Sequence, residues 1–469
     1  MSSRPATLGQ LKESGWESIP VKEEVRRNAI RRIAAGQPLV EGVLGYDDTV
    51  LPQLENALLA GHDVIFLGER GQAKTRIIRS LTGLLDEWIP VISGSEILDD
   101  PYKPVSRYAR DLMEHKGDET PISWVHREER FGEKLATPDT SIADLIGEVD
   151  PIKVAEGRYL SDELTLHYGL VPRTNRGIFA INELPDLSER IQVGLLNVLE
   201  ERDIQVRGYK IRLPLDVMLV ASANPEDYTN RGRIITPLKD RFGAQIRTHY
   251  PLDVSTEISV VEQESSLVRP DGVRVDVPRF MVEIIATLSQ LARQSPHINQ
   301  RSGVSVRLSV ANYETMVASA VRRALRLREP EAVPRVTDLE SLPASTAGKV
   351  EVETIDEGRD GHVIERLVQQ AVVTVFKATV PGEKLRAASA DFDAGEVLHA
   401  GDDVPAASLV SSLEKFPGLR EVLGSVPGVA GSESPALLAS AAEFVLEGLH
   451  LSKRLNKDAA GSRATYRAR

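Results

Sequence analysis

The chain has 469 residues, which is long enough for two or three domains, and 41% of them are hydrophobic, which excludes a disordered protein. Its net charge of −12 argues against binding of nucleic acid or an anionic membrane by the molecule as a whole. The absence of cysteine excludes disulfides and thiolate metal sites, and we expect a cytoplasmic protein without a signal peptide or membrane span.

Residues 1–44 are expected to form a charged, helical N-terminal segment. A short apolar run, His62–Leu67, follows and is typical of a strand. Beyond residue 75, apolar residues return at helical spacing, namely Ile77, Ile78, Leu81, Leu84, Leu85 and Trp88. A strand, a loop and a helix in this order predict that the loop between them binds nucleotide phosphates. The loop reads Gly68-Glu69-Arg70-Gly71-Gln72-Ala73-Lys74-Thr75, and ATP is the expected ligand.

The residue types of this loop suit a triphosphate. Free amides at a helix N-terminus attract anions, Lys74 can reach the β- and γ-phosphates, and the Thr75 hydroxyl can bind Mg²⁺. Ala73 stands where the pattern has glycine. We expect its methyl group to be tolerated only if its φ is below zero.

From residue 45 to residue 251, short apolar runs alternate with helical patterns. This alternation predicts an α/β core with a parallel sheet of five strands covered by helices. The runs are Val64–Leu67, Ile89–Ile92, Ile178–Ile181, Val217–Ala221 and Gln245–Tyr250. The long polar segment Asp99–Arg176 is too long for a simple connection and should contain inserted elements.

Polar residues follow two of the predicted strands. Glu183 lies at the carboxyl end of one strand, where α/β proteins bind ligands, and is our candidate for polarising the attacking water. Asn182, before it, is neutral where a carboxylate usually holds Mg²⁺, so that metal binding or turnover could be weakened. Asn224 follows the next strand and could orient the same water. A helix cap for the first pair and a turn at Asn224 are the alternatives.

Arg241 follows a predicted helical turn and is a candidate for stabilising transition-state charge from a neighbouring subunit. An ion pair with Asp240 or another acid of the same chain is the alternative. Residues 252–330 read as mostly helical, and the family resemblance given below implies that they form a lid. Eight acidic residues between Asp338 and Glu365 face only two basic ones, so we expect an acidic linker at 331–362. Residues 363–469 read as a helical region ending in a basic tail.

In this order the motifs resemble the AAA+ ATPases, in the branch of the magnesium chelatase motor subunit and the MoxR-type ATPases. The resemblance covers about residues 45–327 and assigns Walker A to 68–75, Walker B to Asn182 and Glu183, sensor 1 to Asn224 and the arginine finger to Arg241. It also assigns a helix-2 insert to 147–172, a hairpin before sensor 1 to 203–212, and sensor 2 to Arg307, with Arg301 as the rival.

The resemblance implies a ring, expected to be a hexamer, with ATP and Mg²⁺ between subunits and Arg241 completing the neighbour's site. It implies an ATP-driven motor that remodels a client protein or drives metal insertion, with a von Willebrand A domain protein as partner. Because Asn182 departs from the family pattern, a nucleotide-gated scaffold with little hydrolysis is the alternative. Transcriptional activation of the sigma-54 type is disfavoured, since the string GAFTGA does not occur. Nucleic acid is an unlikely partner for this acidic chain.

Overall fold

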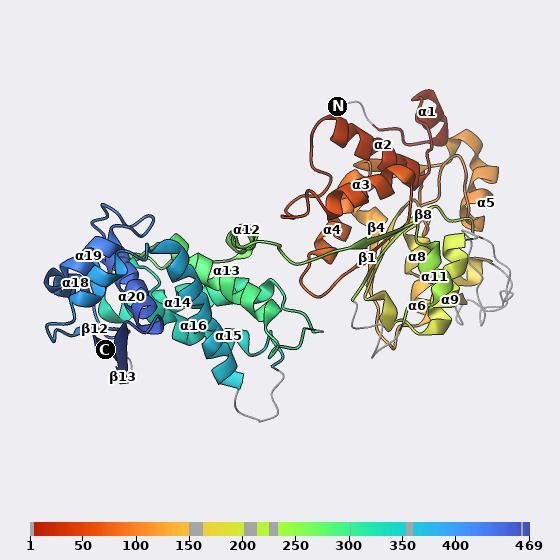
Figure 1. The fold of residues 1–469 in the computed structure, drawn as a ribbon. Coiled ribbons are helices and arrows are strands. Elements are labelled where there is room, and N and C mark those ends of the chain that lie inside the picture. Colours follow the sequence, from red (N-terminus) through yellow and green to blue (C-terminus); the bar gives the residue numbers. More distant parts are fainter. Residues whose placement is uncertain are drawn as a thin grey trace. The chain divides into compact units, whose positions relative to one another are not determined.

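The computed structural model describes residues 4–149, 163–200, 213–224, 233–300, 302–352, 360–460 and 463–469 (Figure 1). Contacts divide the chain into two compact units, residues 1–249 and residues 250–469. Each unit has its own hydrophobic core. Among the described residues, no helix combines the length and the apolar character needed to cross a membrane.

The first unit is built on a five-stranded sheet in which every pairing is parallel, as predicted (Figure 1). The strand order is β4 (Phe131–Leu135), β7 (Gly177–Asn182), β8 (Val217–Ala223), β1 (Val64–Leu67) and β9 (Ala244–Arg247). Because the strands are parallel, their carboxyl ends meet at one edge. That edge carries the ends of β1, β7 and β8, where the sequence placed its candidate site residues.

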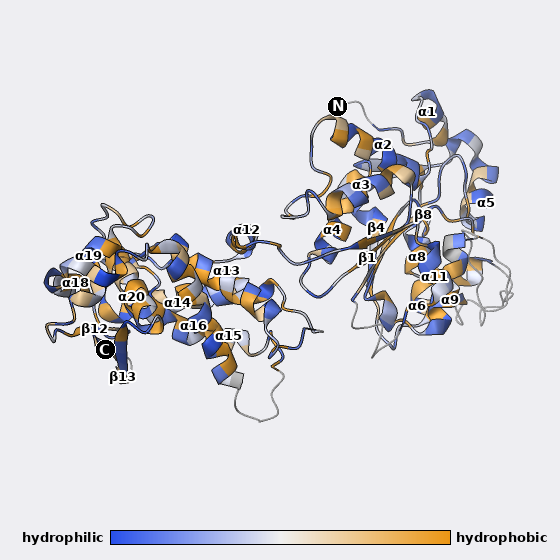
Figure 2. Ribbon diagram, in the orientation of Figure 1, coloured by the Kyte–Doolittle hydropathy of each residue, from blue (hydrophilic) through white to orange (hydrophobic). Residues whose placement is uncertain are grey.

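Alternate residues of the strands pack on opposite faces of the sheet. Val64 and Phe66 of β1 join the core formed with α2 (Val21–Ala34), α3 (Val50–Ala60) and α4 (Lys74–Ser80), while Ile65 joins the core on the other face. The second face is covered by α8 (Leu170–Arg173), α9 (Glu189–Glu200) and α11 (Thr236–Arg241). Figure 2 shows the hydrophobic residues along the central strands. Burial on both faces explains the continuous apolar runs of these strands.

One strand of the sheet was wrongly assigned from the sequence. The run Ile89–Ile92 lies in β2 (Trp88–Ile92), which pairs antiparallel with β3 (Ile122–His126) in a separate sheet. Its expected place is taken by β4, from within the long polar segment. β4 is an edge strand with only two large apolar residues in five, so it gives no buried-strand signal. The helix after the loop is also shorter than predicted, because α4 ends at Ser80.

The N-terminal segment is part of the first unit. Val21, Val25 and Ala29 of α2 are buried in the core beside β1. Glu24 of the same helix forms a buried ion pair with Arg130, whose Nη2 lies 2.6 Å from Glu24 Oε2. The helix therefore docks through both apolar and charged contacts.

The remaining elements of the first unit are short. They are α1 (Leu8–Glu13), η1 (Leu81–Leu84), α5 (Arg107–Lys116), η2 (Gly117–Glu119), η3 (Arg127–Arg130), α6 (Ile142–Leu145), β5 (Gly147–Val149), η4 (Glu163–Thr165), β6 (Leu166–Tyr168) and η5 (Leu184–Asp186). β5 and β6 pair antiparallel within the predicted helix-2 insert. The rest of that insert, residues 150–162, and the predicted hairpin at 203–212 lie outside the described residues.

The second unit packs its helices around one core. Phe280 and Phe444 stack within it, with ring centroids 4.6 Å apart. The elements are α12 (Val254–Glu264), β10 (Arg274–Val275), α13 (Arg279–Gln294), α14 (Arg307–Leu327), β11 (Glu331–Ala332), η6 (Val336–Ser341), α15 (Leu342–Thr346), α16 (Asp360–Thr379), α17 (Leu385–Ala390), β12 (Leu398–Gly401), α18 (Ala406–Ser412), η7 (Leu413–Lys415), α19 (Pro417–Leu423), α20 (Pro435–Leu451), β13 (Leu455–Ala460) and β14 (Arg463–Ala468). The regions predicted as lid and C-terminal region thus share a core.

The described parts of the predicted acidic linker and basic tail are folded. Asp338 is fully buried and accepts a hydrogen bond of 2.9 Å from Arg323 Nη2, so its charge is neutralised inside the fold. At the other end, β14 pairs with β12 and β13 in an antiparallel sheet, with Tyr466 buried. Both segments fold because their charges find partners distant in the sequence.

Candidate nucleotide site

The glycine-rich loop joins β1 to α4 at the carboxyl edge of the sheet. Gly68 is held by a hydrogen bond of 3.1 Å from its amide to the Ala223 carbonyl of β8. A Cβ atom at Gly68 would collide with the side chains of Thr248 and Gln72, so the backbone approach requires glycine. Gly71 has a φ of 76°, in the left-handed region that glycine adopts without strain. The loop therefore has the backbone that the sequence pattern predicts.

Ala73 does not have the backbone angle that we expected. Its φ is +56°, in the left-handed region, and Lys74 begins α4 directly after it. The position needs this conformation to turn the chain into the helix, and alanine adopts it at a cost of roughly 1–2 kcal/mol. The loop therefore keeps the left-handed turn into α4 although alanine stands in place of glycine.

Buried hydrogen bonds from Tyr46 and Thr248 hold the glycine-rich loop, and the sequence analysis did not predict them. Tyr46 OH donates to the Gln72 carbonyl at 2.9 Å and to the His249 carbonyl at 2.7 Å. Thr248 Oγ1 donates to Gln72 Oε1 at 2.7 Å. Burial raises the pKa of Tyr46 to about 12, so the phenol stays protonated and able to donate. These contacts tie the loop to β9 and to the segment before α3.

Lys74, Asn224 and Glu183 form a hydrogen-bonded chain at the edge of the sheet. Lys74 is buried, and its Nζ donates to the Gly68 carbonyl, to the Glu69 carbonyl at 2.7 Å and to Asn224 Oδ1 at 2.7 Å. Asn224 Nδ2 donates to Glu183 Oε2 at 2.6 Å. The structure thus brings together three residues predicted from three separate strand ends.

Glu183 is held in an uncommon backbone conformation. Its φ is +57°, in the left-handed region, at the point where β7 passes into η5. Its amide lies 3.4 Å from Ser222 Oγ of β8. A left-handed, non-glycine residue is strained by about 1–3 kcal/mol and is found more often at functional sites than elsewhere. The strain turns the carboxylate toward Asn224.

Asn182 lies beside a carboxylate that sequence analysis missed. Its Nδ2 donates to Glu133 Oε1 of β4 at 2.5 Å, and its Oδ1 accepts from Ser222 Oγ at 3.1 Å. Glu133 also pairs with Arg79 of α4, whose Nε lies 2.8 Å from Glu133 Oε2. That ion pair raises the pKa of Arg79. A negative charge is therefore present next to Asn182, although Asn182 itself is neutral.

The predicted arginine finger, Arg241, takes no part in this chain of hydrogen bonds. Arg241, at the end of α11, forms an ion pair of 2.6 Å with Glu200, and each side chain is 44% exposed. The alternative of an intrachain ion pair is thus the contact observed in the single chain. Arg307 is exposed at the start of α14 in the second unit, and Arg301 lies outside the described residues.

The donor set fits a nucleotide triphosphate with Mg²⁺. Lys74 supplies a buried cation at the loop, whereas Thr75, Asn182, Glu133 and Glu183 supply oxygen atoms on α4, β4 and the end of β7. Mg²⁺ prefers oxygen ligands and keeps several waters, so it needs few direct protein contacts. The residues present therefore suit both groups.

The chain is similar to known proteins over part of its length. Residues 155–241 match the family described as the Sigma-54 interaction domain. The chain is 29% identical over 237 residues to the magnesium-chelatase subunit ChlI of Nostoc sp., covering 48% of this chain and 57% of that protein. It is 27% identical over 237 residues to the magnesium-chelatase 38 kDa subunit of Rhodobacter capsulatus, covering 48% and 59%.

Among solved structures, a model of the complex between subunits BchI and BchD of magnesium chelatase is similar. It has 21% identity, covers 71% of this chain and 98% of that one, and has a TM-score of 0.36. The sequence matches and the site geometry define a nucleotide-binding P-loop protein of the AAA+ class. Within this class, the chain is similar to magnesium-chelatase subunits over about half of its length. It spans between half and three-fifths of the length of the curated relatives named above.

Proposed function

We propose that the chain binds and hydrolyses ATP at the edge formed by β1, β7 and β8. The single observation that carries this proposal is the hydrogen-bonded chain from Lys74 through Asn224 to Glu183. Lys74 would leave its loop carbonyls for the β- and γ-phosphates, and Asn224 would orient the water that Glu183 polarises. A base within hydrogen-bonding reach of its orienting partner is the geometry that water activation needs.

We further propose that Mg²⁺ is held by Thr75 and, through water, by Asn182 together with Glu133. Bound Mg²⁺ supplies positive charge that offsets the charge of the phosphates. Asn182 fixes Glu133 by a hydrogen bond of 2.5 Å, and Arg79 fixes it from α4. Glu133 thus provides the negative charge that a carboxylate at position 182 would supply.

Exchange of the two side chains tests this role of Glu133. Glu133→Gln should raise the Mg²⁺ concentration needed for half-maximal ATP binding by about tenfold or more, as loss of an outer ligand does elsewhere. Asn182→Asp alone places two carboxylates side by side and should bind Mg²⁺-free ATP more weakly than wild type does. The double variant Glu133→Gln/Asn182→Asp restores one carboxylate and should recover the Mg²⁺ dependence. Titration of a fluorescent ATP analogue with Mg²⁺ measures all three.

Glu129→Gln is the matched control, because Glu129 is exposed in η3 just before β4. It should leave the Mg²⁺ dependence unchanged. If Glu133→Gln lowers only the melting temperature, with the Mg²⁺ dependence of wild type, Glu133 serves Arg79 and not the metal. If the double variant needs as much Mg²⁺ for ATP binding as Glu133→Gln does, the proposal that Glu133 replaces a carboxylate at position 182 would also be contradicted.

At the level of assembly, we propose a ring motor, expected to be a hexamer, in which Arg241 completes the site of the neighbouring subunit and Arg307 contacts nucleotide from the lid. The proposal includes remodelling of a client or metal insertion, and a partner with a von Willebrand A domain. The similarity to magnesium-chelatase subunits supports metal insertion. The exposure of Arg241 supports its role in the neighbour's site, because an exposed ion pair exchanges partners at little cost.

Mixing two inactive variants tests the shared site. Arg241→Ala and Glu183→Gln should each hydrolyse ATP at least about 100-fold more slowly than wild type. In a mixed ring, an Arg241→Ala subunit can supply Glu183 while its neighbour supplies Arg241, so phosphate release should recover in part. Arg27→Ala is the control, because Arg27 is also 44% exposed and also ion-paired.

Different results would separate the alternatives. If mixing restores no activity although both variants assemble, as measured by native mass spectrometry, Arg241 does not act on a neighbour. If wild type binds ATP and assembles but releases no phosphate, the chain alone is a nucleotide-gated scaffold.

A further inference from the structure

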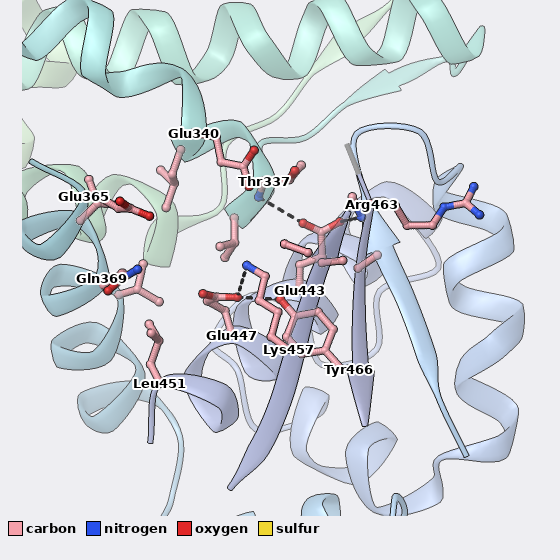
Figure 3. Close-up of a pocket in the computed structure, with 18 of the residues that line it drawn as sticks. Thr337, Glu340, Glu365, Gln369, Glu443, Glu447, Leu451, Lys457, Arg463 and Tyr466 are labelled. Atoms are coloured by element: carbon pink, nitrogen blue, oxygen red, sulfur yellow. Dashed lines mark hydrogen bonds and ion pairs between the residues drawn. The ribbon is translucent and has the colours of Figure 1, made fainter. Parts of the chain in front are cut away.

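The second unit contains a cavity of about 450 Å³ that lies in neither the nucleotide site nor any predicted motif (Figure 3). It is enclosed by η6, α15, α16, β12, α20 and the β13–β14 pair. Sites for small molecules commonly have volumes of this order. Protein interiors are otherwise close-packed, so a space of this size can accept a ligand.

Apolar side chains form much of the cavity wall. They come from separate elements, with Leu339 on η6, Val368 and Val372 on α16, and Leu451 at the end of α20. Such a wall favours an occupant with an apolar body, because water gains few hydrogen bonds there.

The base of the cavity is a closed polar network. Glu447 Oε2 accepts from Lys457 Nζ at 2.9 Å and from Tyr466 OH at 2.6 Å (Figure 3). Burial, followed by the nearby charge of Glu447, raises the pKa of Tyr466, so its hydroxyl stays a donor. The Lys457 charge is therefore already neutralised and does not call for an anionic ligand.

Glu443 adds a second fixed carboxylate to the wall. It is buried, accepts hydrogen bonds from the Thr337 amide at 3.2 Å and the Gly401 amide at 3.4 Å, and lies 3.6 Å from Arg335 Nη1. Its partners hold it in place in the cavity wall, and Arg335 offsets its charge.

Two further carboxylates line the cavity where it opens. Glu340 comes from η6 and Glu365 from α16, and Figure 3 shows both on the side opposite Lys457 and Tyr466. No ion pair or hydrogen bond joins the Glu340 carboxylate to another residue of the described chain, and Glu365 has only His362 within 3.6 Å. Arg463 is paired with Asp403 at 2.8 Å. The lining thus carries an excess of carboxylates over cations. Burial raises the pKa of Glu340, and the nearby charge of Lys457 offsets this only in part.

We propose that this cavity is a binding site for a small organic cation with an apolar body, in which Glu340 and Glu365 bind the charged group and the apolar wall binds the rest. An amine or a guanidinium meets these requirements, because both donate several hydrogen bonds to carboxylates. The occupant is either a free small molecule or the side chain of an arginine or lysine on a partner. This site is independent of ATP hydrolysis.

N-butylguanidine tests the site, with the full chain and without nucleotide. Ligand-observed NMR should show saturable binding with a dissociation constant in the millimolar range, as for a ligand of few atoms. N-butylurea has nearly the same shape but no charge and should bind at least about tenfold more weakly. Glu340→Gln/Glu365→Gln should weaken binding of the cation to the level of the urea, with Glu433→Gln, an exposed acid of the same unit, as the matched control.

Equal binding of N-butylguanidine and N-butylurea, or binding unchanged in the double variant, would overturn the proposal. So would the absence of saturable binding to a folded wild-type chain. A capped Leu-Arg-Leu peptide separates the two sources of the cation. Tighter binding of the peptide than of N-butylguanidine assigns the site to a partner's side chain, and weaker binding assigns it to a free small molecule.

Discussion

Replacing Glu183 by glutamine is expected to abolish ATP hydrolysis by this chain and to leave ATP binding within a few-fold of wild type. Glutamine keeps the size of the side chain and can accept the Asn224 hydrogen bond of 2.6 Å, but it cannot take a proton from water. Loss of a positioned base commonly costs roughly 10²–10⁴-fold in rate. Steady-state phosphate release and binding of a fluorescent ATP analogue measure the two properties separately.

Glu189→Gln is the matched control for this experiment. Glu189 is the first residue of α9, its side chain is 68% exposed, and it pairs with Arg233 at 3.7 Å. It should hydrolyse ATP at the wild-type rate. Phosphate release by Glu183→Gln at that same rate would remove Glu183 from the mechanism, whereas weak ATP binding by Glu183→Gln would show that the substitution damages the site as a whole.

The sequence predicted the convergence of Lys74, Glu183 and Asn224 because each follows a strong apolar run. Parallel strands bring such ends to one edge, so three local patterns were enough to predict one site. The fold class followed from the same runs. One run, Ile89–Ile92, belongs to a separate sheet, and β4 supplies the fifth strand in its place. Hydrophobic burial on both faces of a central strand leaves a local signal in the sequence.

Glu133 could not be predicted in this way. It lies on an edge strand whose five residues include glycine, glutamate and lysine, and its proximity to Asn182 arises only from the pairing of β4 with β7. The acidic linker failed for a related reason. Net charge predicted a solvated segment, but Asp338 is buried against Arg323, whose position on α14 is known only from the tertiary fold. Ion pairs between residues that are brought together only by the tertiary fold leave no local pattern in the sequence.

The backbone angles at the site also could not be predicted from the sequence. A glycine in a motif often indicates a residue with left-handed backbone angles. Ala73 and Glu183 adopt these angles although neither is a glycine. Their φ values are imposed by the turn into α4 and by the turn after β7. Tertiary packing therefore decided these angles against local preference.

Replacing Glu24 by alanine is expected to lower the free energy of unfolding of the first unit by about 3–5 kcal/mol, the usual cost of breaking a buried ion pair. Arg130 and Glu24 are 1% and 4% exposed and make two hydrogen bonds, of 2.8 Å and 2.6 Å. Without Glu24, Arg130 keeps a buried charge whose contacts include the Arg176 carbonyl at 2.9 Å. The Asp86 amide also loses its acceptor, Glu24 Oε1.

Glu23→Ala is the control, because Glu23 is the preceding residue in the same first turn of α2 and pairs with Arg26 while 51% exposed. Both substitutions remove one favourable charge from the N-terminus of α2. The difference between their losses of unfolding free energy therefore reports the contribution of the buried ion pair alone. Glu23→Ala should cost about 1 kcal/mol or less. All three tryptophans, Trp16, Trp88 and Trp124, lie in the first unit, so their fluorescence during urea unfolding reports on it. Equal losses in the two variants would mean that the pair between Glu24 and Arg130 does not hold α2 to the sheet. The expected difference would show that the N-terminal segment is an integral layer of the α/β core.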